Sequence, residues 1–246
     1  GNGPGEMFSC ALGLHSNASN NFYLQDPNSK TCYIVDLKTL LNSRKFVSDE
    51  QFRYSSEVLP TSDLCLLDDN RYIGYHMWYL DDKQFSKVDS PLGYYQKGED
   101  SGKGMDDFPF FVASVNGARL FKNPQTQELW TADMHRDAIR IYNDSLKQIR
   151  ELVGPDHFSP EYTRRQIDAP VAFVTFADEC DYHAYTDYYI TDKHIYLVYE
   201  GNKHFDMKNL SPVEIFKLDF DGNLLCNYKL DRYVYSISCL LYTSPS

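Results

Sequence analysis

The stretch Asp137–Phe158, DAIRIYNDSLKQIRELVGPDHF, decides how the fold is predicted. Its apolar residues recur at intervals of three and four, which is the spacing of an amphipathic helix. Asn143–Ser145 lies in the middle, however, and residues of these types favour turns because their side chains compete for nearby backbone groups. The segment by itself therefore allows either one helix or two strands joined by a turn.

A repeat within the chain decides for two strands. Residues Ile215–Leu230, IFKLDFDGNLLCNYKL, alternate apolar and polar side chains on both sides of Asp-Gly, which predicts a β-hairpin. Cys32–Val47 and Phe85–Gly98 have the same order of residue types. A helix cannot be common to four copies when one contains Asp-Gly and another Ser-Pro. The alignment places these polar residues in register at the end of each first strand: Asp36, Asp89, Asn143 and Asp219.

Further segments extend each copy to a unit of about four short strands in roughly 50 residues, the content of one propeller blade. A glycine turn followed by phenylalanine comes after two of the hairpins, at Gly104–Phe108 and Gly154–Phe158. The predicted fold is therefore all-β, a β-propeller with about four blades. The units cover approximately residues 8–53, 54–110, 111–168 and 169–238, within a single partial propeller domain over residues 1–238. A strand is expected ahead of each hairpin, at Asn21–Leu24, Arg71–Leu80, Glu128–Ala132 and His194–Tyr199.

The repeat motifs resemble those of a known family. Gly1–Glu6 (GNGPGE), the hairpin and then Gly154–Tyr162 (GPDHFSPEY) are similar to the TolB-like six-bladed β-propellers, relatives of the NHL-repeat propellers of bacterial envelope proteins. The resemblance covers nearly all of residues 1–238 and involves repeat motifs, not catalytic ones. It implies a six-bladed ring of which about four blades are present. It also implies an envelope lipoprotein or periplasmic protein, periplasmic or anchored to the outer membrane, without an assigned reaction.

The last residues, Cys239–Ser246 (CLLYTSPS), do not continue the strand pattern. They resemble the translation of a sequencing-library adapter, so we expect a non-native tail on a fragment that lacks both true ends. Four blades would form an open arc, whose terminal blades expose apolar faces and strand edges. The fragment is therefore expected to be less soluble than the complete protein.

Composition and charge narrow the choice of partners. The formal net charge is −11, and such a protein is repelled by phosphate backbones and anionic bilayers, so no nucleic-acid partner is expected. The chain has no run of about 18 apolar residues, so it has no predicted membrane-spanning segment. The six cysteines lack the close pairs of a zinc site or redox motif, which favours buried free thiols.

The segment Phe176–Asp187, FADECDYHAYTD, concentrates carboxylates beside a histidine. Hard cations prefer several oxygen ligands, so calcium is a candidate here, although the glycine and the terminal glutamate of a calcium loop are missing. The alternative is a solvated acidic loop, and no other cofactor is expected. The segment lies in the longest unit, where inserted loops often form binding surfaces. The candidate ligand-binding residues are Asp178, Glu179, Asp181 and His183.

Two other segments contain residues capable of chemistry or binding. The segment Trp130–Ile139 contains Asp133, His135, Arg136 and Asp137. Asp with His can perform acid–base chemistry, but the repeat places these residues in a turn between strands, where polar residues need no chemical role. Trp78, which lies among tyrosines, can stack on sugar rings, although packing within a blade is the simpler interpretation.

The catalytic motifs GxSxG, HExxH and GxxxxGK[ST] are absent from the chain. We therefore predict a non-enzymatic binding or scaffold module for a protein or carbohydrate ligand, with no catalytic residue. The alternative is a propeller enzyme, either a glycoside hydrolase with two carboxylates at the central channel or a calcium-dependent lactonase. The deciding observation is whether Asp or Glu side chains from at least two blades converge at one end of the channel.

Overall fold

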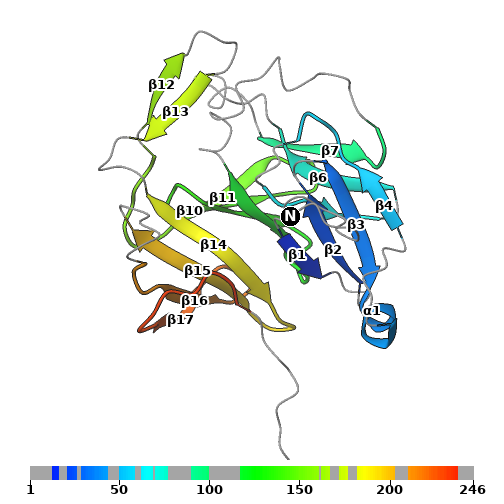
Figure 1. The fold of residues 1–246 in the computed structure, drawn as a ribbon. Coiled ribbons are helices and arrows are strands. Elements are labelled where there is room, and N and C mark those ends of the chain that lie inside the picture. The colour runs from blue at the N-terminus through cyan, green and yellow to red at the C-terminus, as the bar shows by residue number, and fades with distance from the viewer. Residues whose placement is uncertain are drawn as a thin grey trace, which may run out of the picture. The chain divides into compact units, whose positions relative to one another are not determined.

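The computed structural model describes residues 13–16, 21–26, 29–43, 50–58, 62–68, 70–76, 90–99, 117–160, 162–166, 172–176, 182–202 and 210–237. The regular structure in these parts consists of antiparallel strands and one short helix (Figure 1). The chain divides into two compact units. Unit 1 comprises Gly1–Ser114 with Asp168–Val171, and unit 2 comprises Val115–Ile167 with Ala172–Ser246.

Unit 1 contains two antiparallel sheets, with the strand orders β1-β2-β3-β4 and β5-β6-β7. Buried aromatic and aliphatic side chains from both sheets, such as Tyr23, Phe52 and Tyr72, form one core cluster. Two cysteines of this unit, Cys32 and Cys65, are buried free thiols, and burial raises the pKa of Cys32 to about 12. The strands are β1 (Gly13–Ser16), β2 (Asn21–Asp26), β3 (Thr31–Asp36), β4 (Glu50–Arg53), β5 (Cys65–Leu66), β6 (Arg71–Tyr75) and β7 (Leu92–Gln96).

The described residues of unit 2 form two four-stranded sheets and a separate hairpin, β12–β13. A single core cluster, which includes Trp130, Ile141, Leu197 and Phe216, takes residues from both four-stranded sheets. The strands are β8 (Ala118–Lys122), β9 (Leu129–Asp133), β10 (Ala138–Tyr142), β11 (Gln148–Val153), β12 (Tyr162–Gln166), β13 (Ala172–Phe176), β14 (His183–Ile190), β15 (Ile195–Asn202), β16 (Glu214–Leu218) and β17 (Leu224–Lys229). The β12–β13 hairpin spans the limit expected between units 111–168 and 169–238, and those unit limits stay predictions.

The segment that was ambiguous in the sequence forms two strands, as the repeat predicts. Strands β10 and β11 pair antiparallel, with Ala138 opposite Val153. Between them, the Oδ1 atom of Asn143 accepts hydrogen bonds from the backbone N–H groups of Ser145 (3.1 Å) and Lys147 (2.9 Å). The side-chain competition that argued against a helix is therefore the interaction that closes this turn.

The hairpin at the end of the chain has the same construction. Strands β16 and β17 pair antiparallel, and the Oδ1 atom of Asp219 accepts hydrogen bonds from the N–H groups of Asp221 (3.0 Å) and Asn223 (2.8 Å). Asn143 and Asp219, aligned by the repeat, thus occupy equivalent positions. Asp89, in the corresponding copy of unit 1, lies outside the described residues, as does Gly104–Phe108.

The tight hairpin expected within Cys32–Val47 is wrong. A short helix, α1 (Leu37–Ser43), follows β3, and β4 pairs with β3 after this longer connection. Asp36 caps the helix, because its Oδ1 atom accepts a hydrogen bond from the N–H group of Thr39 at 2.7 Å. The segment LKTLLNS contains no glycine or proline, so nothing in it opposes a helix as Asp-Gly and Ser-Pro do in the other copies.

Candidate functional site

Polar side chains gather at one end of the two four-stranded sheets of unit 2. Here β9 ends and β10 begins, while β14 begins and β15 ends, as the pairings of Ala132 with Ile139 and of His183 with Asn202 show. The two sheets meet at this end, since the N–H group of Ala184 donates to the carbonyl oxygen of Met134 at 2.8 Å. We call the following residues the strand-end site: Asp133, His135, Arg136, Asp137, Arg140, Tyr182, His183 and Glu200.

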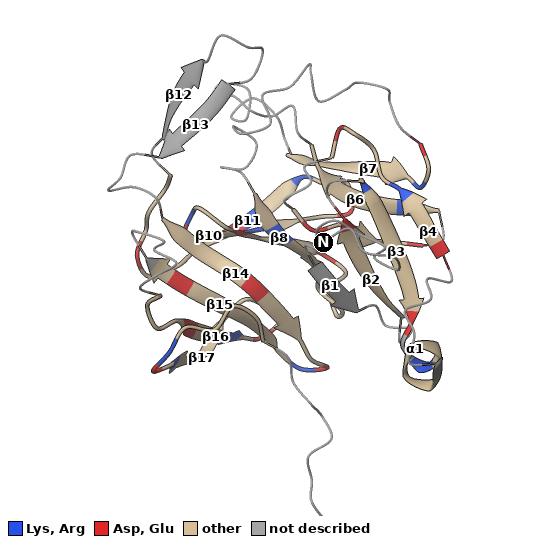
Figure 2. Ribbon diagram, in the orientation of Figure 1, with Lys and Arg blue, Asp and Glu red and all other residues tan. Residues whose placement is uncertain are grey.

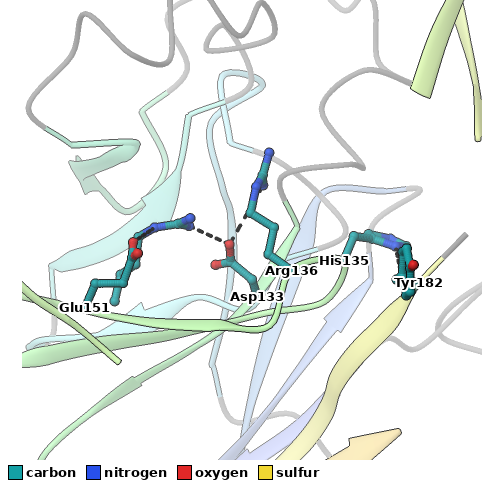
Figure 3. A network of polar contacts seen from close by, with 6 residues as sticks. Asp133, His135, Arg136, Glu151 and Tyr182 are labelled. Carbon is teal, nitrogen blue, oxygen red and sulfur yellow. Dashed lines mark hydrogen bonds and ion pairs between the residues drawn. The ribbon is translucent and has the colours of Figure 1, made fainter. Parts of the chain in front are cut away.

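A charged network surrounds Asp133, the last residue of β9 (Figure 3). Its Oδ2 atom accepts a hydrogen bond from Nη1 of Arg140 at 2.5 Å and lies 3.8 Å from Nη1 of Arg136. Arg140 also donates through Nε to Glu151, which lies directly opposite it on β11, at 2.9 Å. The Asp133 side chain is 1% exposed, so burial raises its pKa, although the two guanidinium groups act in the opposite direction.

Asp137 holds the segment that follows β11. Its Oδ2 atom accepts hydrogen bonds from the backbone N–H groups of Asp156 (2.6 Å) and His157 (2.9 Å), and Tyr185 donates its hydroxyl hydrogen to Oδ1 at 3.1 Å. A Cβ atom on Gly154 would lie 1.8 Å from that Oδ1 atom, so glycine is required at this position. The glycine predicted to turn the chain here therefore makes room for a carboxylate.

A row of aromatic and acidic side chains lies beside these two carboxylates. Nδ1 of His135 is 3.0 Å from the carbonyl oxygen of Tyr182, and Figure 3 shows these two residues next to each other. The rings of His135 and His183 meet edge to face, with centroids 5.1 Å apart. Nδ1 of His183 lies 3.9 Å from Oε2 of Glu200, and Tyr233 donates its hydroxyl hydrogen to Oε1 of the same carboxylate at 2.8 Å.

Glu200 is a buried carboxylate within β15. It is 5% exposed, and its Oε2 atom is buried without a hydrogen-bond partner. Burial raises the pKa of Glu200, while the Tyr233 hydroxyl and the neighbouring His183 lower it. Within the described residues, no group of three or more His, Cys, Asp or Glu side chains is placed to hold a metal ion.

The structure locates only part of the predicted ligand-binding cluster. His183 begins β14 and belongs to the strand-end site. The remaining candidates, Asp178, Glu179 and Asp181, lie outside the described residues, and so does Trp78. The calcium hypothesis for this segment therefore stays a prediction.

The repeat predicts ordinary polar turn residues around Asp133 and Asp137, and the structure shows that both have buried partners. His135 and Arg136 do lie between β9 and β10, but both carboxylates are buried and bonded. The hairpin predicted over Asp137–Phe158 has a strand register, and continuing that register along both strands would have placed Arg140 opposite Glu151. Glu200, within a buried apolar strand, gave no sequence signal of its own.

The family of the chain follows from a match to a family model. Residues 1–239 match the model of the TolB-like 6-blade propeller-like family. The chain belongs to this family. In the described residues, four antiparallel sheets have three or four strands each, so the prediction of an all-β propeller is confirmed. A search of curated protein sequences gave no match.

Several solved structures are similar to this chain. A member of the DUF4221 family from Bacteroides vulgatus is 10% identical, with a TM-score of 0.48 over 87% of this chain and 65% of that one. A putative exported protein from Bacteroides fragilis is 16% identical, with a TM-score of 0.45 over 93% and 60%. Hydrazine synthase from Kuenenia stuttgartiensis is 10% identical, with a TM-score of 0.40 over 92% and 51%. The chain thus spans between half and two thirds of the length of these structures.

Proposed function

We propose that this protein is a non-enzymatic binding module of a bacterial cell envelope, which recognises a protein or carbohydrate ligand through the strand-end site of unit 2. Membership of the TolB-like family supports this proposal, because the resemblance to that family implies an envelope protein without an assigned reaction. No helix in the described part of the chain is long and apolar enough to cross a membrane.

The observation that carries the proposal is the way in which the carboxylates Asp133 and Asp137 are held. Each is 1% exposed and bonded to groups of its own unit: Asp133 to two arginines, and Asp137 to two backbone N–H groups and a tyrosine. A catalytic carboxylate must reach its substrate, whereas the Oδ2 atom of Asp133 and both oxygens of Asp137 are occupied in holding strands and turns together. They therefore act as a rigid support for the residues beside them.

The half-buried side chains on this support are suited to recognition. Tyr182 stacks on Phe158, with ring centroids 4.2 Å apart and planes inclined by 14°, which gives an aromatic pair suited to a sugar ring or an apolar side chain. Arg136 offers a planar guanidinium for carboxylate or hydroxyl groups. Loops and strand ends held by a rigid sheet are the usual place for binding residues in such folds.

The test is a screen of oligosaccharides and short peptides for those that raise the melting temperature, since a ligand of the folded state stabilises it by mass action. The ligands found are then tested on the double variant Arg136→Ala, Tyr182→Ala. A control variant, Lys193→Ala, changes the exposed turn at the other end of β14 and β15. We expect the double variant to lose the rise and the control to keep it. Loss in neither variant would place the binding surface elsewhere and overturn the proposal.

A propeller hydrolase is the second candidate, and one observation favours it. Asp133 and Glu200 come from two different sheets at the same strand end, and burial raises the pKa of both, as for the general acid of a glycosidase. Nitrophenyl glycosides and lactones, with and without calcium, test this alternative. Turnover lost in Asp133→Asn or Glu200→Gln would support an enzyme. A calcium-dependent rise in melting temperature that Asp178→Ala abolishes would support the metal-dependent form.

A further inference from the structure

Glu200 of the strand-end site has a buried oxygen that lacks a hydrogen-bond partner and that lies near His183, a site residue of another strand. Its Oε1 atom is satisfied by Tyr233, whereas its Oε2 atom is buried without a hydrogen bond and lies 3.9 Å from Nδ1 of His183. This separation is too long for a hydrogen bond. A buried carboxylate oxygen without a hydrogen-bond donor is unfavourable, because the group loses its water and the nearby His183 ring replaces it only with a longer charge interaction.

The surroundings of Glu200 favour a cation that donates hydrogen bonds. The carbonyl oxygen of Tyr182 can only accept, so the imidazole of His135 donates to it through Nδ1 and carries its lone pair on Nε2 when neutral. The His135 ring meets that of His183, which lies beside Glu200. The unpartnered Glu200 oxygen therefore lies beside an imidazole ring, and the stacked Phe158 and Tyr182 rings adjoin the same row.

The geometry points to a site for a primary ammonium group, from a free amine or from a lysine side chain, with the Glu200 carboxylate as its charge partner. This inference rests on the proposed function, because it names the ligand chemistry of the same site. An ammonium group carries N–H donors, one of which the Oε2 atom of Glu200 can accept, and aromatic rings attract cations. The net charge of −11 attracts cations to the protein as a whole.

Calorimetric titration of the protein with n-butylammonium and with the peptide acetyl-Gly-Lys-Gly-amide, in cacodylate buffer free of amines and phosphate, tests the inference. The peptide with norleucine in place of lysine, tetramethylammonium and zinc chloride serve as comparison ligands. We expect n-butylammonium to bind and the norleucine peptide not to bind. Binding of the lysine peptide as well would identify a protein side chain as the source, whereas binding of n-butylammonium alone would identify a free amine.

Two variants with the same change in charge make the test specific. Glu200→Gln removes the buried carboxylate, and Glu214→Gln removes a carboxylate at the start of β16 that contacts Lys229 and Asn227. We expect Glu200→Gln to weaken n-butylammonium binding about tenfold or more and Glu214→Gln to leave it unchanged. If both variants weaken binding equally, the net charge of the protein alone explains the binding, and the inference is overturned.

The comparison ligands keep the inference falsifiable if Glu200→Gln does not fold. Tetramethylammonium has the charge but no N–H donor, so binding as tight as that of n-butylammonium would overturn the hydrogen-bonded site. Zinc binding without ammonium binding would overturn it in favour of a metal. Failure of every amine, with a carbohydrate or peptide ligand still dependent on Arg136 and Tyr182, would remove this inference and leave the proposed function in place.

Discussion

At the scale of single residues, Asp137 connects three parts of unit 2. It begins the chain segment that enters β10, it accepts two backbone N–H groups from the segment after β11, and it accepts the hydroxyl of Tyr185 on β14. Tyr185 is itself buried, and burial together with the nearby Asp137 raises the pKa of its phenol. The carboxylate of Asp137 thus links the start of β10 to the segment after β11 and to strand β14 of the neighbouring sheet.

Asp137→Ala tests this role. The variant leaves two backbone donors and a buried hydroxyl without an acceptor, so we expect a loss of about 2–4 kcal/mol in the free energy of unfolding. Urea denaturation measures the loss. Asp192→Ala, in the exposed turn between β14 and β15, is the control and is expected to change stability by less than about 0.5 kcal/mol. Similar losses in both variants would contradict the structural role.

Glu200→Gln tests the buried carboxylate through its dependence on pH. The folded protein raises the pKa of Glu200 above the ordinary value of 4.5, so the folded state binds the proton more tightly than the unfolded state. The contribution of Glu200 to stability is therefore fully present below pH 4.5 and falls as the pH rises through the folded pKa.

The measurement is urea denaturation of both proteins from about pH 5 to about pH 8. We expect the stability of the wild type relative to Glu200→Gln to fall with rising pH, by at most about 1.4 kcal/mol per pH unit. The same difference at every pH, or a difference that grows in favour of the wild type with rising pH, would contradict the assignment.

At the scale of elements, the same hydrogen-bonding arrangement recurs at the ends of several strands. A side-chain oxygen of the residue that ends or directly follows a strand accepts backbone N–H groups two to four positions later. The strands β3, β8, β10 and β16 are each followed by such a contact, through Asp36, Asn123, Asn143 and Asp219 respectively. The same contact opens a helix after β3 and closes a turn after the other three, so it fixes the end of the strand and leaves the next element to the residues that follow.

Substitutions of Asn143 separate this hydrogen bonding from mere exposure of the turn. Asn143→Ala removes the acceptor for Ser145 and Lys147, and we expect a loss of about 1 kcal/mol in the free energy of unfolding. Asn143→Asp keeps the oxygen and is expected to retain most of the stability. Thermal and urea denaturation of both variants provide the measurement. If Asn143→Asp loses as much stability as Asn143→Ala, the side-chain oxygen is not the group that stabilises the turn.

Some of these elements could be predicted from the sequence and others could not. Alternation and turn chemistry predicted the strands of β10–β11 and β16–β17, because both signals are local. Helix α1 was missed because the alignment of copies imposed a hairpin on LKTLLNS, whose own residues tolerate a helix. The buried bonds of Asp133 and Asp137 were missed because their partners Arg140, Asp156 and Tyr185 become neighbours only through strand pairing and sheet packing. The burial of Glu200 and its contacts with Tyr233 and His183 likewise depend on the tertiary structure.

At the scale of the whole molecule, charge is the property that the sequence determines directly. Acidic and basic side chains are both spread over the described strands (Figure 2), and the formal net charge is −11. We expect no association with a labelled DNA duplex at physiological ionic strength, because the phosphate backbone repels such a protein. Fluorescence anisotropy measures this, with a lysine-rich peptide as the positive control. A salt-sensitive rise in anisotropy would contradict the expectation.

The burial of Trp130 also gives unit 2 an optical signal of its own. Its indole is 0% exposed, lies against Phe121 with ring centroids 6.0 Å apart, and has the guanidinium of Arg150 over its ring at 5.9 Å. The chain has two tryptophans, so Trp78→Phe leaves Trp130 as the single indole fluorophore. Its emission is expected at short wavelength in the folded protein and at longer wavelength once water reaches the core. The emission wavelength of Trp130 would then report when the two four-stranded sheets of unit 2 separate.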